Sequence, residues 1–143
     1  MLLFRGTSAG WPGNPATQQF PVTPTTTNPF VATLFAIECQ RFGSGLVITC
    51  LRSDVERFIG AANVLSDIEQ EVVVDVAPGE FQQRFGRWQC GVPQARAALI
   101  AIEFEVPEYI GDKDTLNQWI NDAPVLGEQL QNEFQSRAFG ERL

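Results

Sequence analysis

The sequence predicts an α+β fold built on antiparallel strands, in one domain that spans residues 1–143. Segments typical of strands and of helices are mixed along the chain, but they do not follow the regular βαβ alternation of a parallel sheet. The glycine patterns GxGxxG and GxxxxGK(S/T), which follow a strand in dinucleotide-binding and P-loop proteins, do not occur. A chain of 143 residues is long enough to bury one hydrophobic core.

Composition and charge exclude several kinds of function. The chain holds 17 acidic and 10 basic side chains, a formal net charge of −7 and no histidine. This balance disfavours nucleic acid and an anionic membrane surface as partners, because both are bound by clustered Lys and Arg. Without histidine, Ser-His-Asp and Cys-His catalysis and an HExxH zinc site are excluded, and the three cysteines show no zinc spacing. Any chemistry therefore depends on carboxylates, hydroxyls, Arg, Tyr or cysteine, and no metal site is expected.

The start of the chain and its apolar runs bear on its location. The apolar residues 1–4 are too few for a signal peptide, and Arg5 interrupts them. No apolar run approaches the roughly 20 residues of a membrane-spanning helix. We therefore expect a soluble domain that is cytoplasmic or delivered into a target cell.

The first predicted elements are a strand, a long loop and a helix. Residues 2–7 form an apolar strand. Residues 8–24 are rich in Gly, Pro, Thr and Gln and indicate a loop, either a lid over a site or a loosely ordered surface loop. Asn28 suits a helix cap and Pro29 the first helical position, and apolar residues at helical spacing then continue to Gly43.

The middle of the chain combines short strands with turns. Residues 46–51 are a continuous apolar run and predict a buried strand. Residues 53–58 begin with a capping-box pattern and predict a short helical turn. We expect a loop at 60–69, the most regular strand of the chain at 71–76, and a turn at 77–80.

The C-terminal third is predicted to be mainly helical. Residues 97–106 end in alternating apolar and polar residues, which indicates a strand. Beyond it, Pro124 separates two predicted helices at 114–121 and 125–138. Together these helices make up a helical C-terminal segment over residues 112–139.

Three separated segments hold residue types suited to a site without histidine. The first is an arginine within residues 4–7, at the end of an apolar strand. The second is a run of three hydroxyls at 25–27, just before the predicted helix. The third is a Glu-Gln-Glu segment at 69–71, which leads into an apolar strand. Each pattern alone is typical of exposed surface, so only their combination and order point to a function.

In this order the segments resemble the Arg–Ser–Glu class of mono-ADP-ribosyltransferases, which includes the A chains of cholera toxin and heat-labile enterotoxin. That family has an Arg on its first strand, a Ser-Thr-Ser motif before a helix, and a Glu-x-Glu or Gln-x-Glu at the start of a later strand. The resemblance covers residues 2 to about 90, including residues 31–36 of the helix and 81–88 after the third motif. It implies two packed antiparallel-rich sheets around an NAD+ cleft, with flanking helices. The missing histidine favours this class over relatives that use a His-Tyr-Glu set.

The resemblance also implies an activity: transfer of ADP-ribose from NAD+ to an unidentified protein acceptor, with release of nicotinamide and with NAD+ hydrolysis as a side reaction. Glu71 is expected to stabilise the ribosyl oxocarbenium ion, and Thr25 to hold its carboxylate in place. Arg5 is expected to bind phosphate and ribose, and the backbone of Gly6 to meet the nicotinamide carboxamide. Glu69 beside Glu71 favours an arginine acceptor, because a paired carboxylate can take the guanidinium proton during attack. The expected catalytic residues are Glu71, Glu69, Thr25 and Arg5, and the expected NAD+-binding residues are Arg5, Gly6, Thr7, Thr25, Thr26 and Thr27.

Two other functions stay open. Thr25 stands where the family has its first Ser, and its extra methyl group restricts χ1. This substitution leaves a catalytically degenerate binding module on the same fold as the alternative. The apolar residues at Leu130–Phe134 and Phe139 also fit a C-terminal helix that binds a partner, although such spacing more often reflects core packing.

Overall fold

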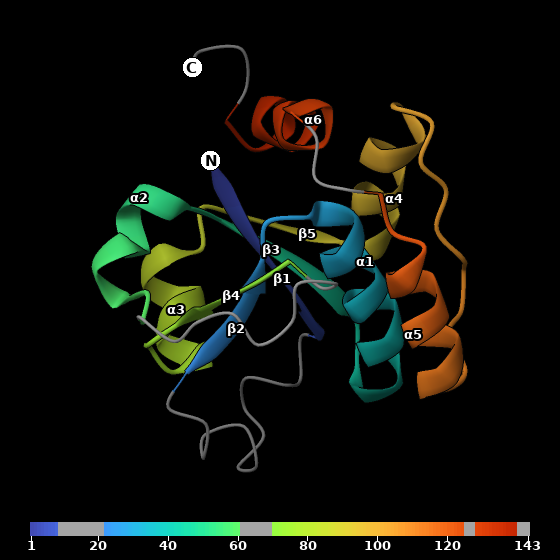
Figure 1. The fold of residues 1–143 in the computed structure, drawn as a ribbon, viewed down its shortest axis with the longest axis horizontal. Helices are drawn as coiled ribbons and strands as arrows, with labels where there is room; N and C mark the ends of the chain where they lie inside the picture. Colours follow the sequence, from blue (N-terminus) through green and yellow to red (C-terminus); the bar gives the residue numbers. More distant parts are fainter. Residues whose placement is uncertain (9–21, 61–69, 125–127, 140–143) are drawn as a thin grey trace.

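The fold is described by a computed structural model, which covers residues 1–8, 22–60, 70–124 and 128–139. Within these ranges, five strands form one antiparallel sheet in the order β4-β2-β1-β3-β5 (Figure 1). The central strand is therefore the first strand of the chain. The strands are β1 (Leu2–Ser8), β2 (Thr23–Thr26), β3 (Gly45–Leu51), β4 (Glu71–Val74) and β5 (Trp88–Gly91).

Helices cover both faces of this sheet (Figure 1). One face is covered by a larger helical layer: α1 (Pro29–Glu38), α4 (Val92–Ile100), α5 (Lys113–Asn121) and α6 (Glu128–Phe139). The other face carries two short helices, α2 (Arg52–Val55) and α3 (Pro78–Phe85). Two 3₁₀ turns, η3 (Cys39–Phe42) and η4 (Glu56–Phe58), follow α1 and α2. None of the described helices has both the length and the apolar character needed to cross a membrane.

Strand β1 is buried on both faces, because its side chains alternate between two cores. Leu2 and Phe4 belong to the core on the α1 side, and Leu3 belongs to the core on the side of α2 and α3. β1 also pairs with β3 along its whole length. The strands predicted at 2–7 and 46–51 are thus confirmed, and burial on both faces explains their continuous apolar sequences.

Helix α1 begins as predicted and packs closely against β1. Asn28 caps it, because its side-chain oxygen accepts a hydrogen bond from the Phe30 N–H at 2.9 Å, and a proline follows the cap. Gly6 lies beneath this helix. A Cβ at Gly6 would overlap the Ala32 carbonyl oxygen and would lie 2.8 Å from the Ala36 nitrogen. The glycine therefore permits the short distance between the helix and the sheet.

The strand predicted at the end of 97–106 is wrong. Helix α4 continues to Ile100, and a turn follows in which Glu103 has a φ of 67°. The reason lies in packing: Ala98 and Leu99 are buried, together with the alanine at 95, at helical spacing. The alternating residues after the turn pair with no described strand, so the alternation reflects partial burial of an irregular segment.

Other parts of the fold also differ from the predictions. The described strands form one sheet rather than the two packed sheets that the resemblance implies. Residues 77–80 are predicted as a turn, but α3 already begins at Pro78. Strand β5 lies in a region for which the sequence predicts no element. Thr23 and Pro24 belong to β2, although the sequence predicts a loop through residue 24. Most of that predicted loop, residues 9–21, lies outside the described residues.

Several element boundaries are also shifted. The capping box predicted at 53–58 does not cap α2, which begins at Arg52 without a side-chain cap. Helix α5 begins one residue early, because the Asp112 side chain caps it. Pro124 separates α5 from α6 as predicted, although residues 125–127 lie outside the described part of the chain.

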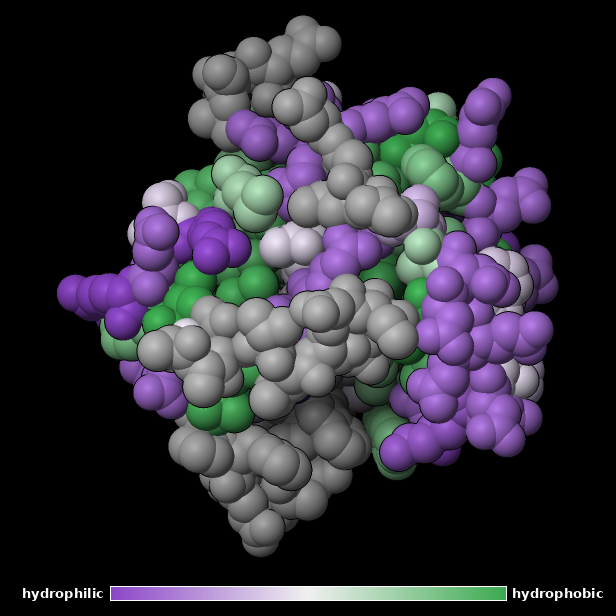
Figure 2. Space-filling model, in the orientation of Figure 1, coloured by the Kyte–Doolittle hydropathy of each residue, from purple (hydrophilic) through white to green (hydrophobic). Residues whose placement is uncertain are grey.

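Much of the negative charge lies in the C-terminal third, where residues 101–143 contain nine acidic and three basic side chains. Helix α5 buries Leu116 and Ile120 and exposes its polar side, which includes Asp114. Figure 2 shows hydrophilic side chains gathered over this helix. Most of the acidic residues of this third therefore lie in and beside helices α5 and α6 and in the segment that precedes α5.

We expect Gly6→Ala to lower the free energy of unfolding by about 3 kcal/mol or more, because the added methyl group must displace backbone atoms of α1. Gly79→Ala is the matched control. Gly79 lies in α3 with nothing within 4 Å of its Cβ position, so its replacement should be neutral or stabilising by up to about 1 kcal/mol. Urea unfolding of the two variants measures the difference, and equal stabilities would contradict the close packing of α1 on β1.

Candidate functional site

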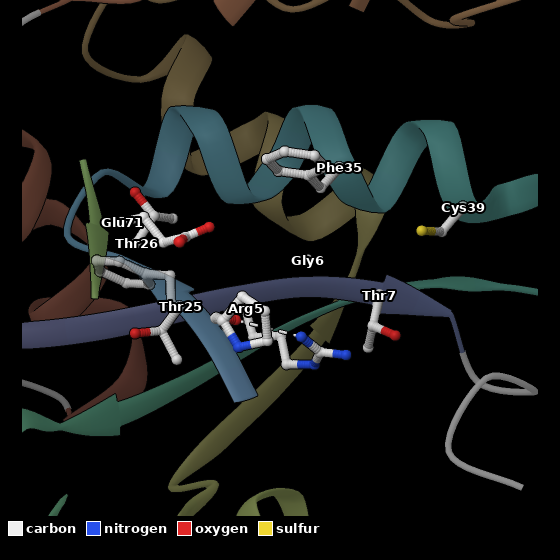
Figure 3. A pocket seen from close by; sticks show the side chains of 10 residues that line it. Arg5, Gly6, Thr7, Thr25, Thr26, Phe35, Cys39 and Glu71 are labelled. Atoms are coloured by element: carbon white, nitrogen blue, oxygen red, sulfur yellow. Dashed lines mark hydrogen bonds between the residues drawn. The ribbon is translucent and has the colours of Figure 1, made fainter. Parts of the chain in front are cut away.

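A cavity of about 320 Å³ opens where strands β1 and β2 part (Figure 3). The two strands pair at one position only, Phe4 opposite Thr26. In this register Arg5 stands opposite Thr25, and the next pair whose backbone groups would face each other is Gly6 opposite Pro24. Proline has no N–H to donate to the Gly6 carbonyl, and the Pro24 carbonyl instead accepts a hydrogen bond from Arg5 Nη1 at 3.2 Å. The ladder therefore ends at this point, and the cavity lies beyond it.

The backbone of Gly6 faces the cavity. The Arg52 N–H donates to the Met1 carbonyl at 3.0 Å, which shows that the odd-numbered residues of β1 bond toward β3. The even-numbered residues therefore turn their N–H and C=O groups toward β2. Phe4 uses these groups opposite Thr26, whereas those of Gly6 point into the gap. A glycine was expected here because it lets a ligand approach the backbone closely. In the structure, the missing Cβ instead leaves room for helix α1.

The cavity brings together residues from three distant segments of the chain. Arg5 and Thr25 lie on the side of the sheet that faces α2 and α3, whereas Thr26 and Glu71 lie on the α1 side (Figure 3). The cavity thus extends through the opening in the sheet. Six of the sequence-predicted residues line it: Arg5, Gly6, Thr7, Thr25, Thr26 and Glu71.

The two threonines of β2 have different roles. Thr25 Oγ1 donates to the Val72 carbonyl at 2.6 Å, so this hydroxyl is committed to strand β4 on the face opposite Glu71. The expected contact from Thr25 to the Glu71 carboxylate is therefore wrong. Thr26 is the residue directly opposite Glu71 in the β2–β4 register. Its Oγ1 accepts a hydrogen bond from the Asn28 N–H at 3.1 Å.

Thr7 brings a buried hydroxyl to the cavity. The residue is 1% exposed, and its Oγ1 has no hydrogen-bond partner among the described residues. A buried hydroxyl without a partner costs roughly 1–3 kcal/mol. A polar ligand atom in the cavity would recover this cost, so Thr7 is suited to bind one.

The two remaining expected site residues are Thr27 and Glu69. Thr27 does not line the cavity. Its N–H donates to the Gln70 carbonyl at 3.2 Å, and its own carbonyl accepts from Gln131 Nε2 at 2.9 Å, so Thr27 joins β2 to its neighbours. Glu69 lies outside the described residues, as does the rest of 61–69.

Arg5 supplies a positive charge to the cavity. Burial lowers the pKa of Arg5 from its ordinary value, because the guanidinium loses water, and the neighbouring Cys39 opposes this shift. An arginine remains charged at neutral pH even so. Its planar donor groups suit a phosphate or carboxylate ligand. Among the described residues, no group of three or more Cys, Asp or Glu side chains is placed to hold a metal ion.

Two further lining residues are not among the predicted site residues: Phe35 on α1 and Cys39, the first residue of η3. They lie one helical turn apart, so the spacing of four residues is the signal that places them on one face. Burial raises the pKa of the Cys39 thiol to about 11, and the negative charge of Glu38 adds to this effect. Cys39 is therefore a neutral thiol at physiological pH, and Phe35 gives this wall of the cavity an apolar surface.

Comparison with known proteins gives no match: no protein-family model, no curated protein and no solved structure is significantly similar to this chain. The geometry of the cavity and the chemistry of its residues are therefore what point to a function.

We expect Cys39 to react slowly with iodoacetamide at pH 8, because at a pKa of about 11 only about one thousandth of the thiol is ionised. The rate should rise about tenfold per pH unit up to pH 10, since the thiolate is the reactive form. Peptide mapping by mass spectrometry measures modification at Cys39, and the chain unfolded in urea is the control. Equal rates for the folded and unfolded chains at pH 8 would contradict the burial of this thiol.

Proposed function

We propose that the chain transfers ADP-ribose from NAD+ to a protein side chain, with arginine as the acceptor. One observation carries the proposal: Arg5, Gly6 and Thr7 on β1 meet Thr26 and Glu71 around a single cavity. Ligand cavities commonly measure roughly 300–1,000 Å³. A volume of about 320 Å³ suits the nicotinamide riboside part of NAD+, with the remainder extending outward.

The chemistry needs a fixed negative charge rather than a proton donor. The bond between ribose C1′ and the nicotinamide nitrogen breaks, nicotinamide leaves with the bonding electron pair as a neutral molecule, and the ribose becomes an oxocarbenium ion. In this proposal, the Glu71 carboxylate stabilises that cation and accepts a hydrogen bond from the ribose 2′-hydroxyl. No step requires histidine, in keeping with a chain that has none.

Three neighbouring residues of β1 are suited to hold NAD+. The guanidinium of Arg5, which lies in the gap between β1 and β2, would bind the diphosphate. The N–H and C=O of Gly6, which face the cavity, match the donor and acceptor of the nicotinamide carboxamide. The buried hydroxyl of Thr7 adds a further polar contact.

Thr26, rather than Thr25, is the residue we propose to orient Glu71. Thr26 stands opposite Glu71 on the same face of the sheet, whereas the hydroxyl of Thr25 is bonded to the Val72 carbonyl on the other face. Because the Asn28 N–H donates to Thr26 Oγ1, the Thr26 hydroxyl presents its proton elsewhere. This arrangement gives the second threonine of the motif the role that the resemblance implies for the first.

The choice of arginine as acceptor depends on the second carboxylate of the motif. A guanidinium has a pKa near ~12.5–13.8 and is not nucleophilic while charged. When its nitrogen attacks C1′, a carboxylate is needed to take the proton that the nitrogen loses. Glu69 supplies such a group two residues before Glu71 in the sequence.

A catalytically degenerate binding module remains the second candidate function. The observation that favours it is the hydrogen bond of 2.6 Å between Thr25 Oγ1 and the Val72 carbonyl, which takes the first hydroxyl of the motif away from the carboxylate. In that case the cavity binds a nucleotide through Arg5 without breaking its glycosidic bond.

We expect the wild-type chain to release nicotinamide from NAD+, and to do so faster with agmatine as an arginine-like acceptor. Glu71→Gln should reduce this rate by about 10²–10³-fold, because it removes the charge that stabilises the oxocarbenium ion. Glu105→Gln, a change at an exposed carboxylate away from the cavity, should have no effect. Chromatography of free nicotinamide measures the rate, and calorimetry measures NAD+ binding.

The outcomes separate the two candidate functions. NAD+ binding that is lost in Arg5→Ala, without nicotinamide release, would favour the binding module. If neither wild type nor Glu71→Gln released nicotinamide or bound NAD+, both candidate functions would be overturned.

We expect Thr26→Val and Thr25→Val to differ in activity but not in stability. Each substitution keeps the volume and removes one buried hydrogen bond, at a cost of roughly 1–3 kcal/mol. Only Thr26→Val should lower kcat for nicotinamide release, by about 10²-fold, because only this hydroxyl stands beside Glu71. Thr26→Ser should restore the rate. A larger loss of kcat in Thr25→Val than in Thr26→Val would show that Thr25, and not Thr26, orients Glu71.

A further inference from the structure

The single pairing of Phe4 with Thr26 divides the β1–β2 interface into two sides. On one side, the register would place Gly6 opposite Pro24, and there the cavity opens. On the other side it would place Leu2 opposite Asn28, but these two residues do not pair. One pair of residues is too little to fix the angle between two strands, so a further contact must hold them.

That contact comes from helix α6. Gln131 Oε1 accepts a hydrogen bond from the Leu2 N–H at 2.7 Å, and its Nε2 donates to the Leu2 carbonyl at 3.0 Å. The same Nε2 donates to the Thr27 carbonyl at 2.9 Å. The side-chain amide of Gln131 thus occupies the place that a β2 residue would take opposite Leu2. It binds β1 to Thr27, the residue that follows β2.

A second contact comes from Pro124, between α5 and α6, and reaches the residue just before β4. The Pro124 carbonyl accepts hydrogen bonds from Asn28 Nδ2 at 2.8 Å and from Gln70 Nε2 at 3.4 Å. Gln70 has a φ of 51° and immediately precedes Glu71. The C-terminal segment therefore holds Thr27, next to Thr26, and Gln70, next to Glu71. These contacts lie on the side of the Phe4–Thr26 pair that is away from the cavity.

We infer that Gln131 is a positioning residue that sets the separation of β1 and β2 at the cavity; as a statement about catalysis, this inference rests on the proposed function. Phe4 and Thr26 act as a pivot, with the Gln131 amide on one side and the cavity on the other. A change in the Gln131 contacts alters the angle between the strands. It therefore alters the distance between Arg5 and Gly6 on β1 and Thr26 and Glu71 across the gap.

The burial of Gln131 supports this role. The residue is 9% exposed and lies beside Leu130 and near Phe134, both of which are buried in the core on the α1 side. A polar side chain at such a place is stable only while its hydrogen bonds are made. Two of its bonds go to the backbone of Leu2 in β1, and the third goes to the backbone of Thr27, directly after β2, so the amide specifies the relative placement of the two strands.

The test compares Gln131→Met with Gln129→Met. The first removes all three hydrogen bonds with little change in volume, and the second makes the same change at an exposed position of α6. Backbone amide chemical shifts of Gly6, Thr7 and Thr25 report the strand separation. Nicotinamide release and NAD+ calorimetry report activity and binding, per mole of folded chain and well below the unfolding temperature.

In Gln131→Met we expect shifted amide signals at Gly6 and Thr25 and a loss in kcat of at least about tenfold. In Gln129→Met both should match wild type. A purely structural role would lower the unfolding temperature of Gln131→Met and leave the amide signals and kcat at their wild-type values, and this result would overturn the inference. If Gln131→Met does not fold, Gln131→Glu, which keeps an acceptor for the Leu2 N–H, is judged by the same two criteria.

A failure of the proposed function gives a different result. Wild type would then release no nicotinamide and bind no NAD+, while the amide signals of Gly6 and Thr25 would still decide whether Gln131 sets the strand separation.

Discussion

The site depends on the point at which the hydrogen-bonded ladder between β1 and β2 stops. Pro24 lies in β2 where its missing N–H falls on the side of β1, so the strand keeps its pairing with β4 and loses it with β1. The Pro24 carbonyl is taken by the side chain of Arg5 rather than by the backbone of Gly6. One imino acid thus opens the sheet, fixes a guanidinium in the opening and leaves the backbone groups of a central strand available to a ligand.

The two hydrophobic cores make this opening possible without loss of the fold. Strand β1 is held along its whole length by β3 and is buried on both faces, so it does not depend on β2 for its position. Helix α1 packs directly on β1 above Gly6 and supplies Phe35 to the cavity, and the η3 turn that follows it supplies Cys39. The wall and the floor of the cavity are therefore parts of the core itself, which keeps its residues in fixed places.

Local signals in the sequence were sufficient for some elements and for much of the site. Asn28 and Pro29 predicted the start of α1, and the apolar runs predicted β1 and β3, because capping and burial act over a few neighbouring residues. The start of strand β2 was missed because a proline is typical of a loop. Its place in a strand becomes clear only from the pairing with β4. Alternation at 102–106 suggested a strand, but no described strand pairs with it. That Thr26 rather than Thr25 stands opposite Glu71 follows from the register of β2 with β4, which no local pattern contains.

The surplus of acidic residues in the C-terminal third has a consequence for the encounter with a charged ligand. At low ionic strength, the surplus of negative charge in residues 101–143 repels an anionic nucleotide at long range. At physiological salt the Debye length is about 8 Å, so exposed charges at greater distances are largely screened. An anion that reaches the opening of the sheet then responds chiefly to Arg5 and Glu71. The capture of such a ligand would therefore become faster as salt is added, the reverse of the behaviour of a basic binding cleft.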